Sequence, residues 1–237
     1  MRNYFTFAGR ESREFGLYIN GHKTFDSPEK NVSTYVVPGR SGDIVEDDRT
    51  FKNVELQYNS SFMFENFDEN FSNLKNFLLS KSGYQRLTDT YHPDEFRKAI
   101  FRKAIQPTMN ESNEVGAFDL VFECQPQRFL ISGEQEIEIT EYGANIVNPT
   151  LFNSKPLLKV YGKGEIEINN YSFEIIDFDE FTEIDCESLD CHQGNINRNE
   201  NVIFTGYKFP ELTPGNNYFI FDQTITKIIV TPRWFRL

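Results

Sequence analysis

The chain has 237 residues, and its 24 Lys and Arg against 36 Asp and Glu give a formal net charge of −12. This excess of carboxylates argues against a protein that grips nucleic acid phosphates from outside, because like charges repel. Hydrophobic residues make up 38% of the chain, which also contains 24 phenylalanines, whose flat rings suit sheet faces and sandwich interiors.

A turn-rich segment, Tyr35–Asp43, lies between two β-branched runs. A phosphate-binding loop would need a Gly-Lys-Ser/Thr ending and a following helix, and this segment has neither. Pro38 presets φ for the second position of a turn, and Gly39 supplies the positive φ that a type II turn demands. We therefore predict a rigid corner that displays Arg40, a candidate to bind a carboxylate on a neighbouring subunit.

One α-helix is predicted near residues 66–82. Asn66 can cap its start and Gly83 can close its end. Because its apolar residues recur at helical spacing, we expect one face to pack on a sheet. These residues are Phe67, Phe71, Leu74, Phe77 and Leu78.

The five residues Phe96–Ile100 are repeated at once as Phe101–Ile105. Five residues are out of phase with the two-residue period of a strand, so Phe96 and Phe101 would face opposite sides of an unbroken strand. A helix does no better, because five residues turn through about 500°. We predict a β-bulge near Ala99 to Phe101 that restores the phase.

The second half restarts the strand-and-turn pattern after a boundary near Gln125–Leu130, where Pro126 limits continued strand pairing. Residues Glu165–Asn169 alternate cleanly, which predicts one buried and one solvated face. Many short strands separated by turn residues favour β-sandwiches over a βαβ fold. The predicted class is therefore all-β, with two domains, residues 1–131 and residues 132–237.

Residues that could support catalysis or metal binding are scattered. His22, His92 and His192 lie far apart, none at metal-ligand spacing from another, and each is predicted to be a turn or surface residue. No nucleophile-elbow motif occurs. We predict no catalytic, cofactor-binding or metal-binding residues. The lone Trp234 could be a platform for a sugar, although a core or interface anchor is the more common role.

An acidic stretch runs from Glu165 to Asn197 without a Lys or Arg. No glycine lies at the sixth position of a calcium loop, which excludes an EF-hand. A glycosidase pair would need two carboxylates facing each other across a cleft, whereas interleaved Phe178, Phe181 and Ile184 favour a half-buried strand with a solvated acidic face. The crowded acids are Asp177, Asp179, Glu180, Glu183, Asp185, Glu187 and Asp190.

The three cysteines, Cys124, Cys186 and Cys191, show no scaffold pattern, and free thiols are expected in a reducing cytosol. Cys186 and Cys191 are close enough in sequence to bridge a turn, and their redox state stays open. No apolar run is long enough to span a membrane, and the mixed polar start predicts no signal peptide.

Several segments, in this order over nearly the whole chain, resemble the distal tail protein (Dit) family of siphophages, the long-tailed, non-contractile phages, that infect Gram-positive bacteria. The segments that carry the resemblance are Leu17–Gly21, Val37–Asp43, Glu123–Phe129, Asn148–Leu157 with Val160–Gly162, Phe209–Asn217 and Pro232–Trp234.

The resemblance implies an N-terminal, ring-forming β-sandwich with one α-helix and a protruding hairpin, followed by a C-terminal galectin-like β-sandwich. It also implies a hexameric ring at the virion tail tip, assembled in the host cytoplasm, through which DNA passes. Such a ring joins the tail tube protein to the tail-associated hub or spike protein, and often carries receptor-binding proteins. The family has no catalytic residues to carry over, and the net acidity suits a bore through which DNA must slide.

Two other functions compete with a structural hub. One is a carbohydrate-binding module for bacterial surface glycans, motivated by the aromatic content and the implied galectin-like domain. The other is a glycan hydrolase that uses the acidic stretch, and it requires Asp177 or Asp185 to be essential. The chain has no room for a separate inserted sugar-binding module beyond its two domains.

Overall fold

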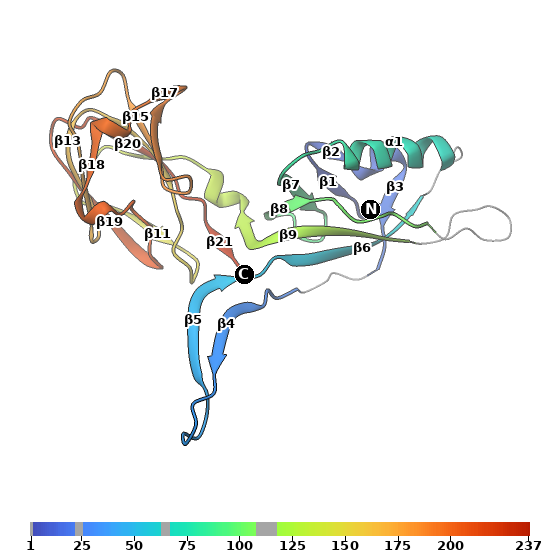
Figure 1. The fold of residues 1–237 in the computed structure, drawn as a ribbon. Coiled ribbons are helices and arrows are strands. Elements are labelled where there is room, and N and C mark those ends of the chain that lie inside the picture. Colours follow the sequence, from blue (N-terminus) through green and yellow to red (C-terminus); the bar gives the residue numbers. More distant parts are fainter. Residues whose placement is uncertain (1, 22–25, 63–66, 108–117) are drawn as a thin grey trace. The chain divides into compact units, whose positions relative to one another are not determined.

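A computed structural model describes residues 2–21, 26–62, 67–107 and 118–237, and its fold is all-β with one α-helix in those residues. The chain divides into two compact units (Figure 1): Met1–Arg128 together with Leu237, and Phe129–Arg236. No helix in the described ranges is long and apolar enough to cross a membrane.

The first unit is built on one antiparallel sheet in which β2, β1, β7, β8, β9, β6 and β3 follow one another. Its two ends approach each other, because the Ile19 N–H in β3 donates to the Asn3 carbonyl at 3.0 Å, just before β1. The sheet therefore curls into two facing layers. Its strands are β1 (Phe5–Phe7), β2 (Arg10–Glu11), β3 (Leu17–Ile19), β6 (Val54–Phe62), β7 (Gln85–Asp89), β8 (Glu95–Ile100) and β9 (Phe118–Leu130), with a 3₁₀ turn at Ser12–Phe15.

Aromatic rings fill the core of this unit. Phe122 lies at the centre, with ring centroids 5.3 Å from Phe5, 5.1 Å from Phe7 and 5.2 Å from Phe101. Edge-to-face and tilted arrangements of this kind add to the free energy gained by burying the rings. The high phenylalanine content therefore serves the interior of the curled sheet.

The predicted helix is α1 (Phe67–Leu79), which covers one face of the sheet (Figure 1). Leu74 and Leu78 are fully buried. Phe77, about one helical turn after Leu74, is partly buried and packs against the same core. Gly83 has a φ of 67°, in the left-handed region where glycine is favoured. The proposed cap, Asn66, lies outside the described residues.

The repeat at Phe96–Ile105 does not form one long bulged strand. Strand β8 ends at Ile100, and its register with β7 is regular from Arg97 to Ala99. Phe96 lies on the partly exposed face under the Arg86 guanidinium, whereas Phe101 follows the strand end and turns into the core. The predicted bulge is absent: burial alternates without interruption at Glu95, Arg97, Ala99 and Phe101, so Phe96 and Phe101 face opposite sides, as the two-residue period requires.

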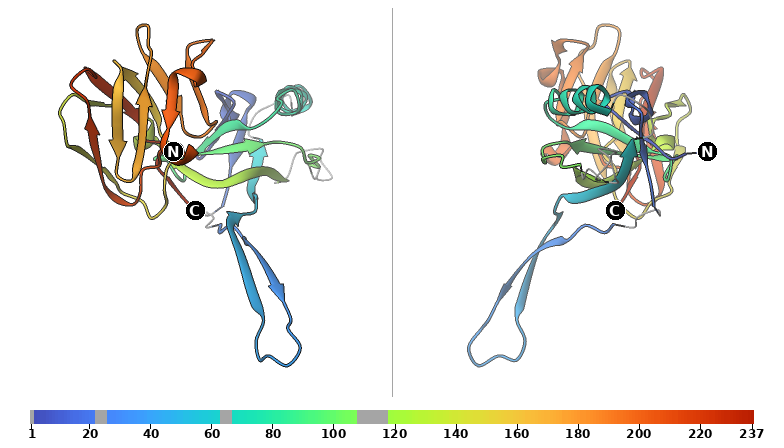
Figure 2. Two further views of the ribbon diagram at one scale, coloured as in Figure 1. Left: turned by 60° about the vertical axis from the view of Figure 1, so that its left-hand side comes forward. Right: turned by 90° about the vertical axis from the view of Figure 1, so that its right-hand side faces the viewer.

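A separate two-stranded sheet, β4 (Lys30–Tyr35) and β5 (Ile44–Phe51), forms a hairpin between β3 and β6. Figure 2 shows it extending away from the curled sheet of its own unit. Its residues are exposed, except at Asn31, Val37 and Phe51, which are partly covered.

The second unit is a sandwich of two antiparallel sheets around one apolar core. The alternation predicted for Glu165–Asn169 is confirmed in β13, where Ile166 and Ile168 are buried and Glu165 and Glu167 face outward. One sheet orders β10 (Ile137–Ile139), β20 (Lys227–Thr231), β12 (Leu157–Tyr161), β15 (Thr182–Asp185), β16 (Asp190–Gln193) and β17 (Ile196–Asn197). The other orders β11 (Ala144–Asn148), β19 (Gly215–Phe221), β13 (Gly164–Ile168), β14 (Tyr171–Ile175) and β18 (Val202–Phe204).

The segment around Pro126 stays extended. Pairing of β9 with β6 ends at Cys124, but β9 runs on to Leu130, and the next residues, Ile131–Glu134, form a 3₁₀ turn.

Trp234 is 4% exposed and its carbonyl accepts the Leu130 N–H at 2.8 Å. Trp234 is therefore a core anchor and not a sugar platform. The remaining elements are 3₁₀ turns at Asn199–Asn201 and Thr205–Tyr207 and strand β21 (Phe235–Arg236).

Candidate functional site: the exposed hairpin

The hairpin formed by β4 and β5 presents two open strand edges. The two strands pair with each other from Tyr35 opposite Ile44 to Val32 opposite Asp47, and in the described part of the chain they join no other sheet. Each strand therefore has a row of backbone N–H and C=O groups without a ladder partner. Such edges are templates for pairing with another chain.

The tip of the hairpin is the corner predicted from the sequence. The Arg40 N–H donates to the Val37 carbonyl at 3.1 Å, and Gly39 has a φ of 81°, which together define the type II turn around Pro38. Gly42, also at 81°, bends the chain into β5. The Arg40 guanidinium is exposed and forms no ion pair within the described residues, so it is displayed with all its donors available.

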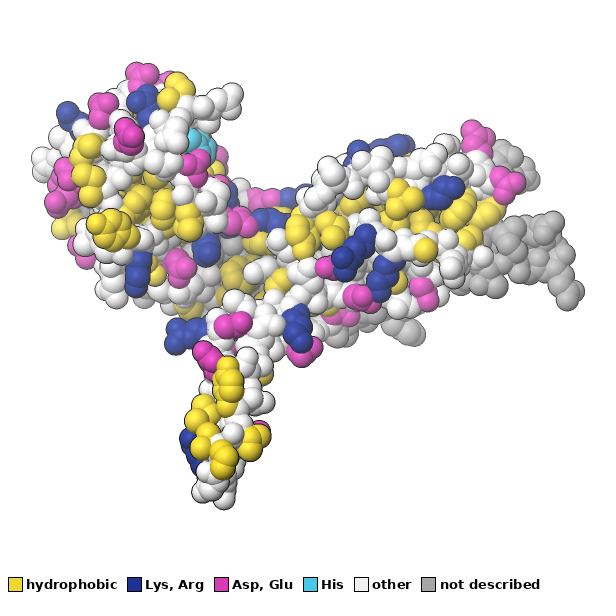
Figure 3. Space-filling view, viewed as in Figure 1, with side chains coloured by type: hydrophobic (Ala, Val, Ile, Leu, Met, Phe, Trp, Pro, Cys, Tyr) yellow, Lys and Arg dark blue, Asp and Glu magenta, His cyan; other side chains and the backbone are white. Residues whose placement is uncertain are grey.

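Exposed apolar side chains gather on the hairpin (Figure 3). Val36 is 80% exposed, Val45 61% and Tyr35 52%, and Val32 and Ile44 are also exposed. Cross-strand pairing places Tyr35 and Ile44 together on one face and Val32 and Val45 on the other. Apolar side chains gathered on a projecting element mark an interaction surface more often than a solvated loop.

The base of the hairpin is bent and held by charge pairs. Between Val32 and Lys30 the partner strand advances from Asp47 to Phe51, so β5 carries extra residues here, and Arg49 has a φ of 60°. The Asp47 carboxylate accepts the Arg49 N–H at 2.8 Å and also contacts the Lys30 ammonium. These hydrogen bonds, that from Lys30 foremost, lower the pKa of Asp47.

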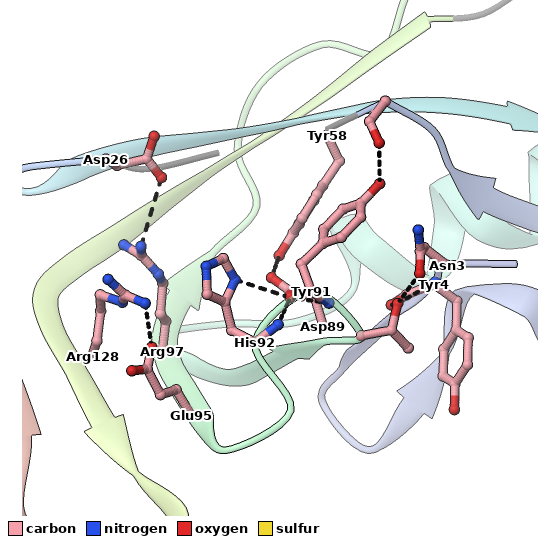
Figure 4. Close-up of polar contacts among 12 residues, drawn as sticks. Asn3, Tyr4, Asp26, Tyr58, Asp89, Tyr91, His92, Glu95, Arg97 and Arg128 are labelled. Atoms are coloured by element: carbon pink, nitrogen blue, oxygen red, sulfur yellow. Dashed lines mark hydrogen bonds and ion pairs between the residues drawn. The ribbon is translucent and has the colours of Figure 1, made fainter. Parts of the chain in front are cut away.

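Buried polar contacts lie where the chain enters the hairpin (Figure 4). Asp26 precedes β4, and its carboxylate lies 3.6 Å from the Arg97 guanidinium of β8. Nearby, the Tyr58 hydroxyl donates to Asp89 at 2.6 Å, and burial, followed by the charge of Asp89, raises the Tyr58 pKa well above its ordinary value. Of these contacts, the one between Asp26 and Arg97 holds the segment before β4 against β8.

Two of the predicted histidines have carboxylate partners. His92 lies in the turn between β7 and β8, as one of the two predicted settings requires, but its side chain is largely buried, with Nδ1 3.2 Å from Asp89. His192 Nδ1 lies 3.3 Å from Glu183. His22 lies outside the described residues. No group of three or more His, Cys, Asp and Glu suited to a metal ion occurs in the described ranges.

The crowded acids of the second unit take separate partners. Glu183 lies between Lys159 and His192, Asp185 binds Arg233, and Asp190 accepts from Asn199. In β15, Glu183 and Asp185 alternate with the buried Thr182 and Ile184, which agrees with a half-buried strand. This arrangement gives no pair of carboxylates facing each other across a cleft.

Arg40 was predicted from the sequence as a contact residue, but the exposed apolar side chains on either side of it were not. The sequence does place valines and an isoleucine on either side of the corner, but it does not show that they are exposed. Burial, however, depends on what packs against a strand, and a sequence pattern does not state that.

Comparison with known proteins connects this geometry to phage tails. No family model matches the chain, and no curated protein matches it in sequence. Among solved structures, the SPP1 Dit protein (gp 19.1) matches over 100% of both chains with a TM-score of 0.80 at 12% identity. That protein is described as a paradigm of the hub adsorption apparatus in phages that infect Gram-positive bacteria.

Chains of the phage P2 baseplate in its activated conformation also match. The structure with Ca covers 97% of this chain and 98% of the other, with a TM-score of 0.53 at 7% identity. The structure with Sr covers 99% and 98%, with a TM-score of 0.53 at 8% identity. The chain thus has the fold of phage tail hub and baseplate proteins, and the resemblance to the distal tail protein family is confirmed at the level of the fold.

Proposed function

We propose that this protein is a structural hub of a phage or prophage tail tip and not an enzyme. The observation that carries the proposal is the full-length match to the SPP1 Dit fold, which takes in both units of the chain. Because one fold can host many functions, a surface suited to the proposed function must also be present. The hairpin, with open edges, exposed apolar faces and a displayed arginine, supplies a surface suited to assembly.

The proposed assembly is a closed ring of six subunits, formed by the first unit. A closed ring needs a heterologous interface, in which two different patches of each subunit meet. The hairpin is one patch, because pairing of its edges with the next subunit would satisfy backbone groups that are otherwise open. The boundary at residues 131 and 132 and the galectin-like character of the second domain belong to the same proposal.

The proposed partners are the tail tube protein on one side, the tail-associated hub or spike protein on the other, and receptor-binding proteins carried by the ring. DNA would pass through the bore without sequence-specific binding, and the net charge of −12 would keep it from adhering. The protein would act at the virion tail tip after assembly in the host cytoplasm, with no membrane partner.

Light scattering on the purified protein over a wide range of concentrations tests the ring, and electron microscopy would show its symmetry. A matched variant replaces residues 30–51 with Asn-Gly. The Lys52 N–H already donates to the Glu29 carbonyl at 2.9 Å, so a two-residue turn can close the chain there. We expect rings from the native protein and monomers from the variant. A native protein that stays monomeric even with the tail tube and tail-associated proteins present would contradict the ring.

A further inference from the structure

The five-stranded sheet of the second unit carries a groove on its solvated face. The groove has a volume of about 530 Å³ and is lined by residues of β13, β14, β18 and β19 together with Tyr142, Thr205 and Asp222. It shares no residue with the hairpin.

Carboxylates dominate the lining. Sheet register places Glu165 directly opposite Glu174, and Asp222 lies beside Glu165, whose N–H donates to the Asp222 carboxylate at 2.9 Å. Glu167 points to the same face two residues further along β13. The groove thus has four carboxylates and no Lys, Arg or His in its lining.

These glutamates lack the partners that other acids of the unit possess. Glu165, Glu167 and Glu174 form no ion pair in the described part of the chain, whereas Glu183 and Asp185 each face a cation. Side chains directly opposite in a sheet have Cβ atoms about 5 Å apart, and like charges in such positions destabilise the pairing. A cation placed between Glu165 and Glu174 would remove that cost.

Apolar side chains border the carboxylates. Ile203 of β18 lies opposite Glu174, and Ile220 of β19 lies opposite Glu167. Both are exposed. A lysine or arginine side chain matches this combination, because its aliphatic stem can lie on the isoleucines while its charged end reaches a carboxylate. A neutral sugar would leave the three glutamates without a counter-charge.

We infer that this groove docks an extended, lysine- or arginine-rich segment of a partner protein. The volume accommodates a few side chains and not a folded domain. Charge complementarity selects the partner, and the opposed pair Glu165 and Glu174 forms its centre.

The test is a fluorescence anisotropy titration of the full chain with a labelled peptide of alternating lysine and alanine, beside a glutamate–alanine peptide of equal length. The groove variant carries E165Q, E167Q and E174Q. The matched control carries E136Q, E180Q and E200Q, which removes the same charge from exposed positions elsewhere in the unit. We expect the groove variant to bind the lysine peptide about tenfold more weakly, the loss of roughly three exposed charge contacts, and the control to bind almost as the native protein does.

Equal weakening in both variants would mean attraction by net charge alone and would overturn the inference, as would equal binding of the two peptides by the native protein. Lactose that binds the native groove while the lysine peptide does not would also overturn it, in favour of a sugar site. The single variant E174Q guards against misfolding: it should melt no lower than the native protein, because it relieves the repulsion from Glu165, and should still weaken peptide binding.

Discussion

The Arg233 guanidinium donates two hydrogen bonds to the Asp185 carboxylate, from Nη1 to Oδ1 at 2.6 Å and from Nη2 to Oδ2 at 2.9 Å, although the two residues lie 48 positions apart in the sequence. Asp185 ends β15, and its carboxylate also accepts the backbone N–H groups of Glu187 and Ser188. The Arg233 N–H in turn donates to the Gly133 carbonyl at 2.7 Å. The ion pair therefore ties the C-terminal segment to the six-stranded sheet, and the backbone hydrogen bond ties it to the 3₁₀ turn at Ile131–Glu134.

Replacing Asp185 with Asn should destabilise the protein by about 1–3 kcal/mol, because Arg233 would lose its charged partner in a partly buried position. Urea denaturation of the native and variant proteins measures this difference. Glu200→Gln is the control, since Glu200 is exposed and makes no ion pair in the described residues, and it should change stability by less than about 0.5 kcal/mol. Equal stability of Asp185→Asn and the control would contradict the tie.

The same pair predicts a loss of stability in acid. Burial alone would raise the pKa of Asp185, but the hydrogen bonds and charge of Arg233, with the two backbone N–H groups, lower it from 3.8 to about 2. The stabilising contribution is therefore complete above pH 4 and is lost as the pH falls from about 4 to about 2. Allowing for the partial exposure of the carboxylate, we expect about 1 kcal/mol over this window. Thermal melting of native protein and Asp185→Asn should converge as the pH falls, and parallel curves would contradict the assignment.

The two phenylalanines of the repeated segment should differ in their energetic roles. Phe101 is 6% exposed and packs against Phe122, so Phe101→Ala should cost about 3–5 kcal/mol. Phe96 is only partly covered, beneath Arg86, and Phe96→Ala should cost about 1 kcal/mol, mainly the ring contact with the guanidinium. Chemical denaturation of the two variants compares them directly. Equal costs would mean that both rings lie in comparable surroundings.

All three thiols should resist alkylation in the folded protein. Burial raises the pKa of Cys124 and of Cys191 to about 12, and it raises the pKa of Cys186 as well, so the reactive thiolate is scarce near neutral pH. Iodoacetamide followed by intact-mass measurement should show no label on native protein and three labels after unfolding in guanidinium. Rapid native labelling, or a mass loss showing that Cys186 and Cys191 pair readily in air, would contradict this expectation.

If the protein assembles into the proposed ring, Arg40→Ala should weaken that assembly about tenfold, as expected when a charged contact is lost at an interface. The concentration at which rings dissociate, followed by light scattering, measures the effect. Lys155→Ala, which removes one exposed cation from the second unit, is the control. If Arg40→Ala rings are as stable as native rings, the corner serves only to shape the hairpin.

Local features of the fold were predictable from the sequence because their causes are local. The positive φ of Gly39, the alternation in β13 and the helical spacing from Phe67 to Leu78 each depend on neighbours in the chain. The opposite orientations of Phe96 and Phe101 also follow from the two-residue period of a strand, whereas the position at which β8 leaves its ladder was not predictable. Folding of the whole sheet decides that position.

The groove illustrates the same limit. The sequence drew attention to the crowded acids from Asp177 to Asp190, but most of these have individual partners in the fold. The unpartnered carboxylates are those that sheet register brings together, Glu165 and Glu174, on two different strands. Distance along the chain does not show which side chains share a face, and pairing of strands determines it.

The hairpin interrupts the connection between β3 and β6, which are direct neighbours in the curled sheet, with Leu17 opposite Phe62 and Ile19 opposite Ser60. Both ends of the insertion thus return to the same place, and the aromatic core beneath it takes nothing from β4 or β5. The hairpin could consequently be removed or replaced without disturbing the packing of the curled sheet. Its length or sequence could change, in evolution or by design, so that a subunit binds different neighbours while the fold of the first unit stays the same.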